Sequence, residues 1–291
     1  MNDLTVSNAN VARIESQLFN VVAKPLVVLE DHFFNPNSFG IYKENGGLPL
    51  GVVGKDFMAS QPKDLFKALV PCLVDANLSL DKLTYQTFKD DAKISFRTPI
   101  KMISFKNLKG QNDESMLYLN LQTGFDGYTK SSMYLTMMRM VCTNGMKAIN
   151  TEFSVSFKNT KGNAHNISML CNDVAKSVNQ VESIEAMILR LNSVKFDKKS
   201  KALFLTKVLG YDVNEPKEKM HAIRLASLEQ IESAIAIEVA RTGDTLWGLV
   251  NGISYFTNHL NTAKNQADYL YQGGGNLLNM KAQKVALEMA K

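Results

Sequence analysis

Six cations lie between Lys89 and Lys109, and they are the side chains of this chain best suited to meet a polyanion. Two aspartates accompany them, so this stretch carries a net charge of +4, against +5 for all 291 residues. In KISFRTPIKMISFK (Lys93 to Lys106), polar and apolar residues alternate as far as Met102. This alternation predicts a strand with its cations on one face and its apolar side chains on the other.

Cations that neutralise phosphates, beside aromatic rings on which bases stack, are what single-strand binding requires. We therefore expect a non-enzymatic protein that binds or anneals single-stranded DNA in replication or recombination. A solvated sheet face, whose lysines merely prevent edge pairing, is the plainer alternative, and the choice between DNA and RNA stays open. The expected phosphate contacts are Lys93, Arg97, Lys101, Lys106, Arg139 and Lys158, and the expected stacking rings are Tyr118, Tyr128 and Tyr134.

Other chemistry has little support in the residue spacing. The four histidines show no HxxH or HxxxH spacing and no GxSxG elbow is present, so we expect no metal, cofactor or catalytic residue. The run GGLPLGVVGKD resembles a phosphate loop, but Pro49 replaces its first glycine and Asp56 replaces the final Ser or Thr. Three scattered cysteines without CxxC spacing predict reduced thiols; they are Cys72, Cys142 and Cys171.

The composition is that of an ordinary globular protein, with 45% apolar and 21% charged residues. The N-terminus MNDLTVSNANVARIESQLF contains acidic residues and lacks the apolar core of a signal peptide. No window of 18 apolar residues occurs, which argues against a membrane span. These features predict a cytoplasmic protein that has no membrane partner.

The elements that must position the cations form an α+β pattern: an antiparallel meander sheet, one long helix and a helical C-terminal half. Pro99 favours an edge strand, and a phase slip at Ile103 predicts a bulge. We expect an N-terminal arm and loops over 1–50, a sheet-plus-helix core over 51–195 and a helical region over 196–291. The four expected strands are Lys93–Met102, Leu117–Gln122, Tyr134–Cys142 and Phe153–Phe157, and the long helix is Ile167–Leu191.

Further elements follow from shorter patterns. Leu4 to Val22 reads as a short amphipathic helix or a strand-like arm. The density of proline and glycine over Pro25 to Leu50 predicts loops with one short strand around Leu26 to Leu29. Steps of three and four between apolar residues predict the remaining helices, which are Lys63–Val70, Lys199–Leu209, Pro216–Ala240, Thr245–Lys264 and Asn276–Lys291. A meander followed by a long helix is similar to the topology of single-strand annealing proteins, whose rings of subunits imply a homo-oligomer.

Four stretches together resemble the "phage/plasmid-like protein" family, a domain of unknown function found in phages, prophages and plasmids. They are VVGKDFMASQPKDLFKAL, LQTGFDGYTKSSMYLTMMRMVCTNGMKA, GNAHNISM and DTLWGLVNGISYFTNHL, in this order. The resemblance implies a mobile element within an infected or host bacterial cell. The residues that match its motifs are Asp126, Gly127, Arg139, Val141, Cys142, Asn144, His165, Trp247, Asn251 and His259.

Two other functions stay open. One is an enzyme acting on nucleic acid or nucleotide, in which Asp126, His165, Asn251 and His259 converge and a histidine serves as general base. The other is an interaction protein that disarms a host defence system, for which the basic face would be an interface with an acidic protein.

Overall fold

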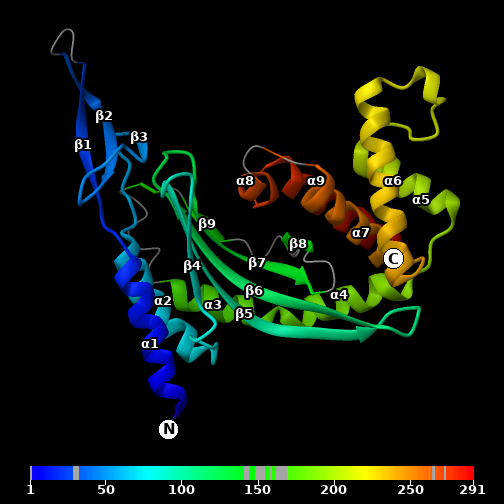
Figure 1. Cartoon of the computed structure of the whole chain (residues 1–291), viewed down its shortest axis with the longest axis horizontal. Helices are drawn as coiled ribbons and strands as arrows, with labels where there is room; N and C mark the ends of the chain where they lie inside the picture. Colours follow the sequence, from blue (N-terminus) through cyan, green and yellow to red (C-terminus); the bar gives the residue numbers. More distant parts are fainter. Residues whose placement is uncertain are drawn as a thin grey trace. The chain divides into compact units, whose positions relative to one another are not determined.

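The computed structural model describes residues 2–28, 33–140, 144–147, 155–157, 159–160, 169–261, 263, 266–271 and 273–291. The fold is α+β, with antiparallel sheets followed by a helical C-terminal half, which confirms the predicted class (Figure 1). The chain divides into two compact units, each assembled from three stretches of sequence. Unit 1 consists of Met1–Ile100, Tyr118–Leu135 and Glu152–Asn179, and unit 2 of Lys101–Leu117, Thr136–Thr151 and Gln180–Lys291.

Unit 1 begins with a helix and a small antiparallel sheet whose strands lie in chain order. The prediction of loops with one short strand over Pro25 to Leu50 is wrong in extent, because strands cover Val21–Val28 and Phe33–Lys43. Pro25 is tolerated because the pairing register shifts between Pro25 and Val27, and such a bulge does not require the missing N–H. The elements are α1 (Asn2–Gln17), β1 (Val21–Val28), β2 (Phe33–Lys43) and β3 (Gly51–Gly54).

Two helices of unit 1, α2 (Pro62–Asp75) and α3 (Leu170–Asn179), contact each other and are joined by a disulfide between Cys72 and Cys171. The prediction of reduced thiols is therefore wrong for this pair. The two cysteines are 99 residues apart in the sequence, so no local spacing reveals their pairing. Cys142 lies outside the described residues. A cytoplasmic location stays a prediction.

The larger sheet has six strands in the order β4-β5-β6-β7-β8, and β9 also pairs with β7 (Figure 1). Four of these strands were predicted from their alternation. The sheet's edge is formed by β4 rather than by β5, and β4 pairing ends where Thr84 meets Arg97, so Pro99 has no β4 partner. The strands are β4 (Thr84–Phe88), β5 (Lys93–Lys106), β6 (Asn112–Gly124), β7 (Ser131–Arg139), β8 (Asn144–Lys147) and β9 (Val155–Phe157).

The helical C-terminal half belongs to unit 2. The single long helix predicted over Ile167–Leu191 is in fact two helices, because α3 ends at Asn179 and α4 begins at Val181. Asn179 is a weak helix former next to this break. The elements are α4 (Val181–Ser193), α5 (Lys198–Leu209), the 3₁₀ turn η3 (Lys217–Lys219), α6 (Ala222–Thr242), α7 (Leu246–Tyr255), the π-helical segment η4 (Phe256–Leu260), α8 (Gln266–Tyr271) and α9 (Gly274–Met289).

Side-chain caps set where two of these helices begin. The Asp197 carboxylate accepts from the Ser200 N–H at the start of α5, and the Thr245 hydroxyl oxygen accepts from the Gly248 N–H at the start of α7. Helix α7 is buried from Leu246 to Ser254 because it contacts α4, α6 and α9. Among the described helices, none combines the length and the apolar character needed to traverse a bilayer.

Candidate functional site

In unit 1 the two faces of the larger sheet differ in chemistry, as the alternation of β5 predicts. On the apolar face, the Phe96 ring stacks on Phe66 of α2 with 5.5 Å between ring centroids, so α2 covers this side. The opposite side, which we call the polar sheet face, carries polar and charged residues of three strands. Its members are Lys93, Ser95 and Arg97 on β5, Tyr118, Asn120 and Gln122 on β6, and Tyr134 on β7.

Arg97 and Tyr118 form the most distinctive pair on the polar sheet face. The guanidinium carbon of Arg97 lies 3.6 Å from the centroid of the Tyr118 ring, and both side chains are partly buried. The Arg97 Nε atom is buried and has no hydrogen-bond partner among the described residues. No carboxylate of the described chain lies within ion-pair distance of this guanidinium. A partly buried cation without a counter-charge is costly, so the pair offers a binding place for an anion.

Lys93 and Tyr134 do not offer accessible groups. Lys93 is 3% exposed, with its Nζ 3.9 Å from Asp126 Oδ2, and the Tyr134 hydroxyl donates to Gln122 Oε1 at 2.9 Å. The expectation that Lys93 meets phosphate and Tyr134 stacks a base is therefore corrected, since a buried side chain can do neither. A period of two shows which side a residue faces and does not show what covers that side.

In unit 2, Arg139 is buried between two carboxylates. Its Nε donates to Asp113 Oδ1 at 2.6 Å, its Nη1 pairs with Glu238, and Asp113 Oδ2 lies 3.4 Å from the indole nitrogen of Trp247. Asp113 and Glu238 are fully buried. The cluster is therefore structural, and Arg139 cannot contact a nucleic acid from inside it. Arg139 is therefore withdrawn from the phosphate-binding set. Glu238 was missed because nothing in its local sequence marks it as the partner of a strand residue.

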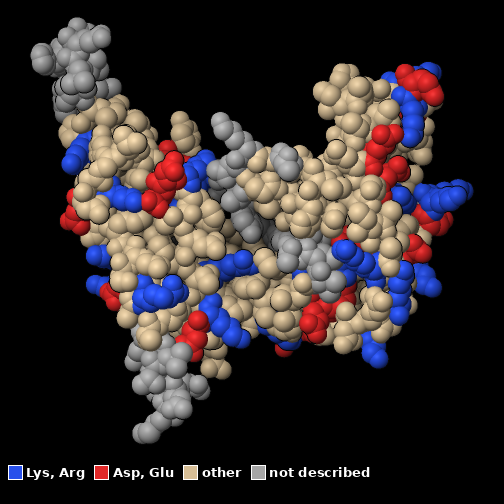
Figure 2. Space-filling model, in the orientation of Figure 1, with Lys and Arg blue, Asp and Glu red and all other residues tan. Residues whose placement is uncertain are grey.

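The other predicted cations differ in accessibility. Lys101 is 45% exposed and its Nζ lies 2.6 Å from Glu185 Oε2, whereas Lys106 is exposed. Lys158 lies outside the described residues. On the face shown in Figure 2, lysine and arginine side chains are interspersed with aspartate and glutamate rather than gathered in one groove. This face therefore offers an anionic partner separate cations rather than a broad basic field.

Tyr128 is the predicted stacking ring that the structure leaves open, with 91% of its surface exposed. It follows the Asp126–Gly127 turn between β6 and β7. Asp126 Oδ1 accepts from the N–H groups of Tyr128 and Thr129, at 3.0 and 2.7 Å. A side chain on Gly127 would meet the carbonyl oxygen of Val52 at 2.9 Å, and its φ is +79°. Asp126 and Gly127 therefore fix the shape of this turn, which explains the motif without a catalytic role.

The remaining motif residues are explained by local packing or lie outside the described chain. Trp247 is buried, and Asn251 donates to its carbonyl oxygen at 2.8 Å while the Asn251 Oδ1 atom is buried without a partner among described residues. His259 is exposed, with its ring 4.7 Å from that of Tyr255. Asn144 belongs to β8, but its side chain is not described. Residues outside the described part are Val141, Cys142 and His165.

Two of the four side chains that the enzyme hypothesis requires have structural roles. Asp126 caps a turn and Asn251 is enclosed in the core of unit 2, so neither carries an open catalytic group. Within the described residues, no three side chains of His, Cys, Asp or Glu gather as metal ligands would. The catalytic use of His165 stays a prediction outside the described part of the chain.

The turn between β4 and β5 holds the clearest electrostatic shift in unit 1. Three successive residues, Lys89 to Asp91, have positive φ angles between 52° and 69°. Asp91 pairs with Lys43 of β2, and the hydrogen bonds from Lys43 and then from Thr87 hold the pKa of Asp91 below its usual 3.8. Burial, followed by the charge of Asp91, raises the pKa of Tyr85. The ion pair thus anchors the small sheet to this hairpin.

Comparison with known proteins identifies one family. A family model described as "Domain of unknown function (DUF932)" matches residues 49–274. No curated protein and no solved structure matches the chain. The matched range includes the Asp126–Gly127 turn, the Arg139 strand and the Trp247 helix on which the resemblance to a domain of unknown function was based.

Proposed function

The chain belongs to the DUF932 family of unknown function, and from this premise we propose that it binds single-stranded nucleic acid through the Arg97–Tyr118 pair, since the other five members of the polar sheet face are buried. The observation that carries the proposal is the Arg97 guanidinium, which stacks on Tyr118 and has no carboxylate partner among the described residues. A phosphate group would supply both the missing counter-charge and an acceptor for the N–H groups of Arg97.

The stacked geometry suits a strand whose bases are unpaired. The guanidinium carbon of Arg97 lies 3.6 Å from the centroid of the Tyr118 ring, and bases of single strands stack on guanidinium planes as well as on aromatic rings. In a duplex the base faces are already stacked on each other. The pair is therefore expected to favour a single strand over a duplex of the same sequence.

The accessible members of the expected contact set are fewer than the sequence suggested. In unit 1, Arg97 is retained for phosphate contact, and Tyr118 and Tyr128 for stacking. Lys101 and Lys106 belong to unit 2, and their contact with phosphate stays a prediction. Annealing, a role in replication or recombination, assembly into a homo-oligomer and a phage or plasmid setting stay predictions. The similarity of the sheet-then-helix order to annealing proteins supports the first of these only through topology, which is a weak guide to function.

The proposal is tested by fluorescence anisotropy with a labelled single-stranded oligonucleotide and the full chain. Arg97→Ala should weaken binding about tenfold, because one charge-assisted phosphate contact is lost. Arg224→Ala is the matched control, since Arg224 also lies over a tyrosine ring, 5.1 Å from the centroid of Tyr211, but in unit 2. It should leave the affinity within about twofold of the wild type.

Two outcomes would overturn the proposal: no binding of any oligonucleotide by the wild-type chain, or an equal loss of affinity in Arg97→Ala and Arg224→Ala. Circular dichroism of each variant shows whether it is folded. Capture of one stoichiometric host protein, together with the first outcome, would favour the defence-blocking alternative.

A further inference from the structure

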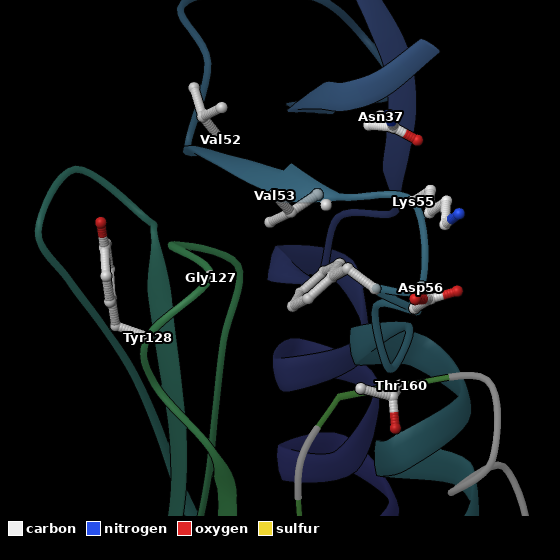
Figure 3. A pocket seen from close by; sticks show the side chains of 10 residues that line it. Asn37, Val52, Val53, Lys55, Asp56, Gly127, Tyr128 and Thr160 are labelled. Atoms are coloured by element: carbon white, nitrogen blue, oxygen red, sulfur yellow. The ribbon is translucent and has the colours of Figure 1, made fainter.

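An open pocket lies in unit 1, between the loop that follows β3 and the turn between β6 and β7. Its volume is about 540 Å³, within the range of roughly 300–1,000 Å³ common for small-molecule sites. Figure 3 shows Tyr128 on one side of the pocket and Lys55 and Asp56 on the opposite side. The residues that line it are Asn37, Val52, Val53, Gly54, Lys55, Asp56, Phe57, Gly127, Tyr128 and Thr160.

The Tyr128 ring is exposed although its backbone is held firmly. Its N–H donates to Asp126 Oδ1, and the Thr129 hydroxyl donates to Asp126 Oδ2 at 2.9 Å. The Asp126–Gly127 turn lies closely against β3: a Cβ atom on Gly51 would be only 2.5 Å from the carbonyl oxygen of Phe125. A ring that is 91% exposed on a fixed turn is already positioned to stack on a planar group, at little further cost in backbone entropy.

The other walls divide the pocket into an apolar part and a charged rim. Val52, Val53 and Phe57 supply aliphatic and aromatic surface, and Val52 is itself 56% exposed. The exposed Lys55 supplies one cation, and the adjacent Asp56 supplies an acceptor. A ligand that fits can therefore offer a planar ring to Tyr128, and an anion and hydrogen-bond donors to the opposite side, where the Lys55 and Asp56 side chains are directed away from the Tyr128 ring (Figure 3).

A nucleotide within a strand has all three features. Its base can lie on Tyr128, its phosphate can meet Lys55, and its exocyclic amino or sugar hydroxyl groups can donate to Asp56. A paired base cannot enter, because both of its faces are covered by neighbouring bases in the stack.

We propose that this pocket holds one unstacked base of a bound single strand, with the base on the Tyr128 ring. The inference rests on the proposed function and adds a second contact, separate from the Arg97–Tyr118 pair. It also assigns a use to the GVVGKD segment, which fails as a phosphate loop but lines the pocket from Val52 to Asp56.

The test uses the full chain, a labelled single-stranded oligonucleotide and the corresponding duplex. Tyr128→Ala should weaken single-strand binding about tenfold, since base–aromatic stacking is lost. Tyr128→Phe should retain most of the affinity, because the ring is kept. Tyr211→Ala is the matched control in unit 2, where the tyrosine hydroxyl donates to the Arg224 carbonyl oxygen and has no part in the proposed site.

A second readout does not depend on affinity. Irradiation of the complex with an oligonucleotide containing 5-iodouracil should crosslink a peptide that includes Tyr128, as mapped by mass spectrometry. Unchanged affinity in Tyr128→Ala together with no crosslink to this peptide would overturn the pocket inference while leaving the Arg97 proposal intact. Failure of the wild-type chain to bind any oligonucleotide would instead overturn both.

Discussion

Arg97 and Arg139 show how surroundings decide what an arginine does. Arg139 is held by Asp113 and Glu238 in a buried cluster, so its charge is balanced inside unit 2. The guanidinium of Arg97 lies over the ring of Tyr118 and forms no ion pair with a carboxylate of the described residues. One arginine therefore stabilises the fold, and the other is available for a ligand.

Replacing Arg139 by methionine tests the structural half of this contrast. Arg139→Met leaves two buried carboxylates without their cation, so the free energy of unfolding should fall by about 3–5 kcal/mol. Urea denaturation followed by circular dichroism measures this change. Lys217→Ala, which breaks an exposed pair with Glu229, should change stability by less than about 0.5 kcal/mol. Equal effects of both substitutions would contradict the structural role.

Asp91 gives a prediction about pH. The hydrogen bond from Lys43 is the main reason that the pKa of Asp91 lies below 3.8 in the folded chain. The ionised Asp91 therefore stabilises the fold above about pH 3.8, and this stabilisation is lost as the pH falls through the folded-state pKa. Lys43→Met removes the main cause. The melting temperature of this variant should lie below that of the wild type at about pH 6, and the gap should narrow by about pH 3. Thermal melts at both pH values check this, and a gap of constant size would count against it.

Among the helices and strands, most of those with a regular spacing of apolar residues were predicted correctly. The alternation in β5 and β6 and the helical spacing of α5 and α9 required only neighbours in the sequence. Strand β2 was missed, and only the end of β1 was predicted, because the prolines and glycines of this segment signal loops, whereas pairing between the two strands overrides that signal. The disulfide was missed because its cysteines are 99 residues apart, and the break at Gln180 was missed because the apolar spacing continues across it.

The α2–α3 disulfide carries a prediction at this scale. It closes a long loop, since its cysteines are 99 residues apart, and such crosslinks typically stabilise by about 2–4 kcal/mol. The double variant Cys72→Ser/Cys171→Ser should therefore melt at a lower temperature than the oxidised wild type. Dithiothreitol should lower the wild-type melting temperature toward that of the variant and leave the variant unchanged. No response of the wild type to the reductant would contradict the stabilising role.

For the whole molecule, the sequence predicted the α+β class and membership of a domain of unknown function. It placed too many groups in the candidate site, because it could not show that Lys93, Arg139 and Tyr134 are buried. The net charge of +5 is modest, and on the face shown in Figure 2 the cations are interspersed with carboxylates. Strand binding by this protein should therefore depend on a small number of phosphate contacts.

The salt dependence of binding tests the central claim most directly. If Arg97, Lys101 and Lys106 each neutralise one phosphate, the slope of log K against log salt should be about −2 on single strands. Arg97→Ala should reduce the magnitude of that slope by about 0.7, and Arg224→Ala should leave it unchanged. Identical slopes for the wild type and Arg97→Ala, or binding that ignores salt, would contradict a phosphate contact at Arg97.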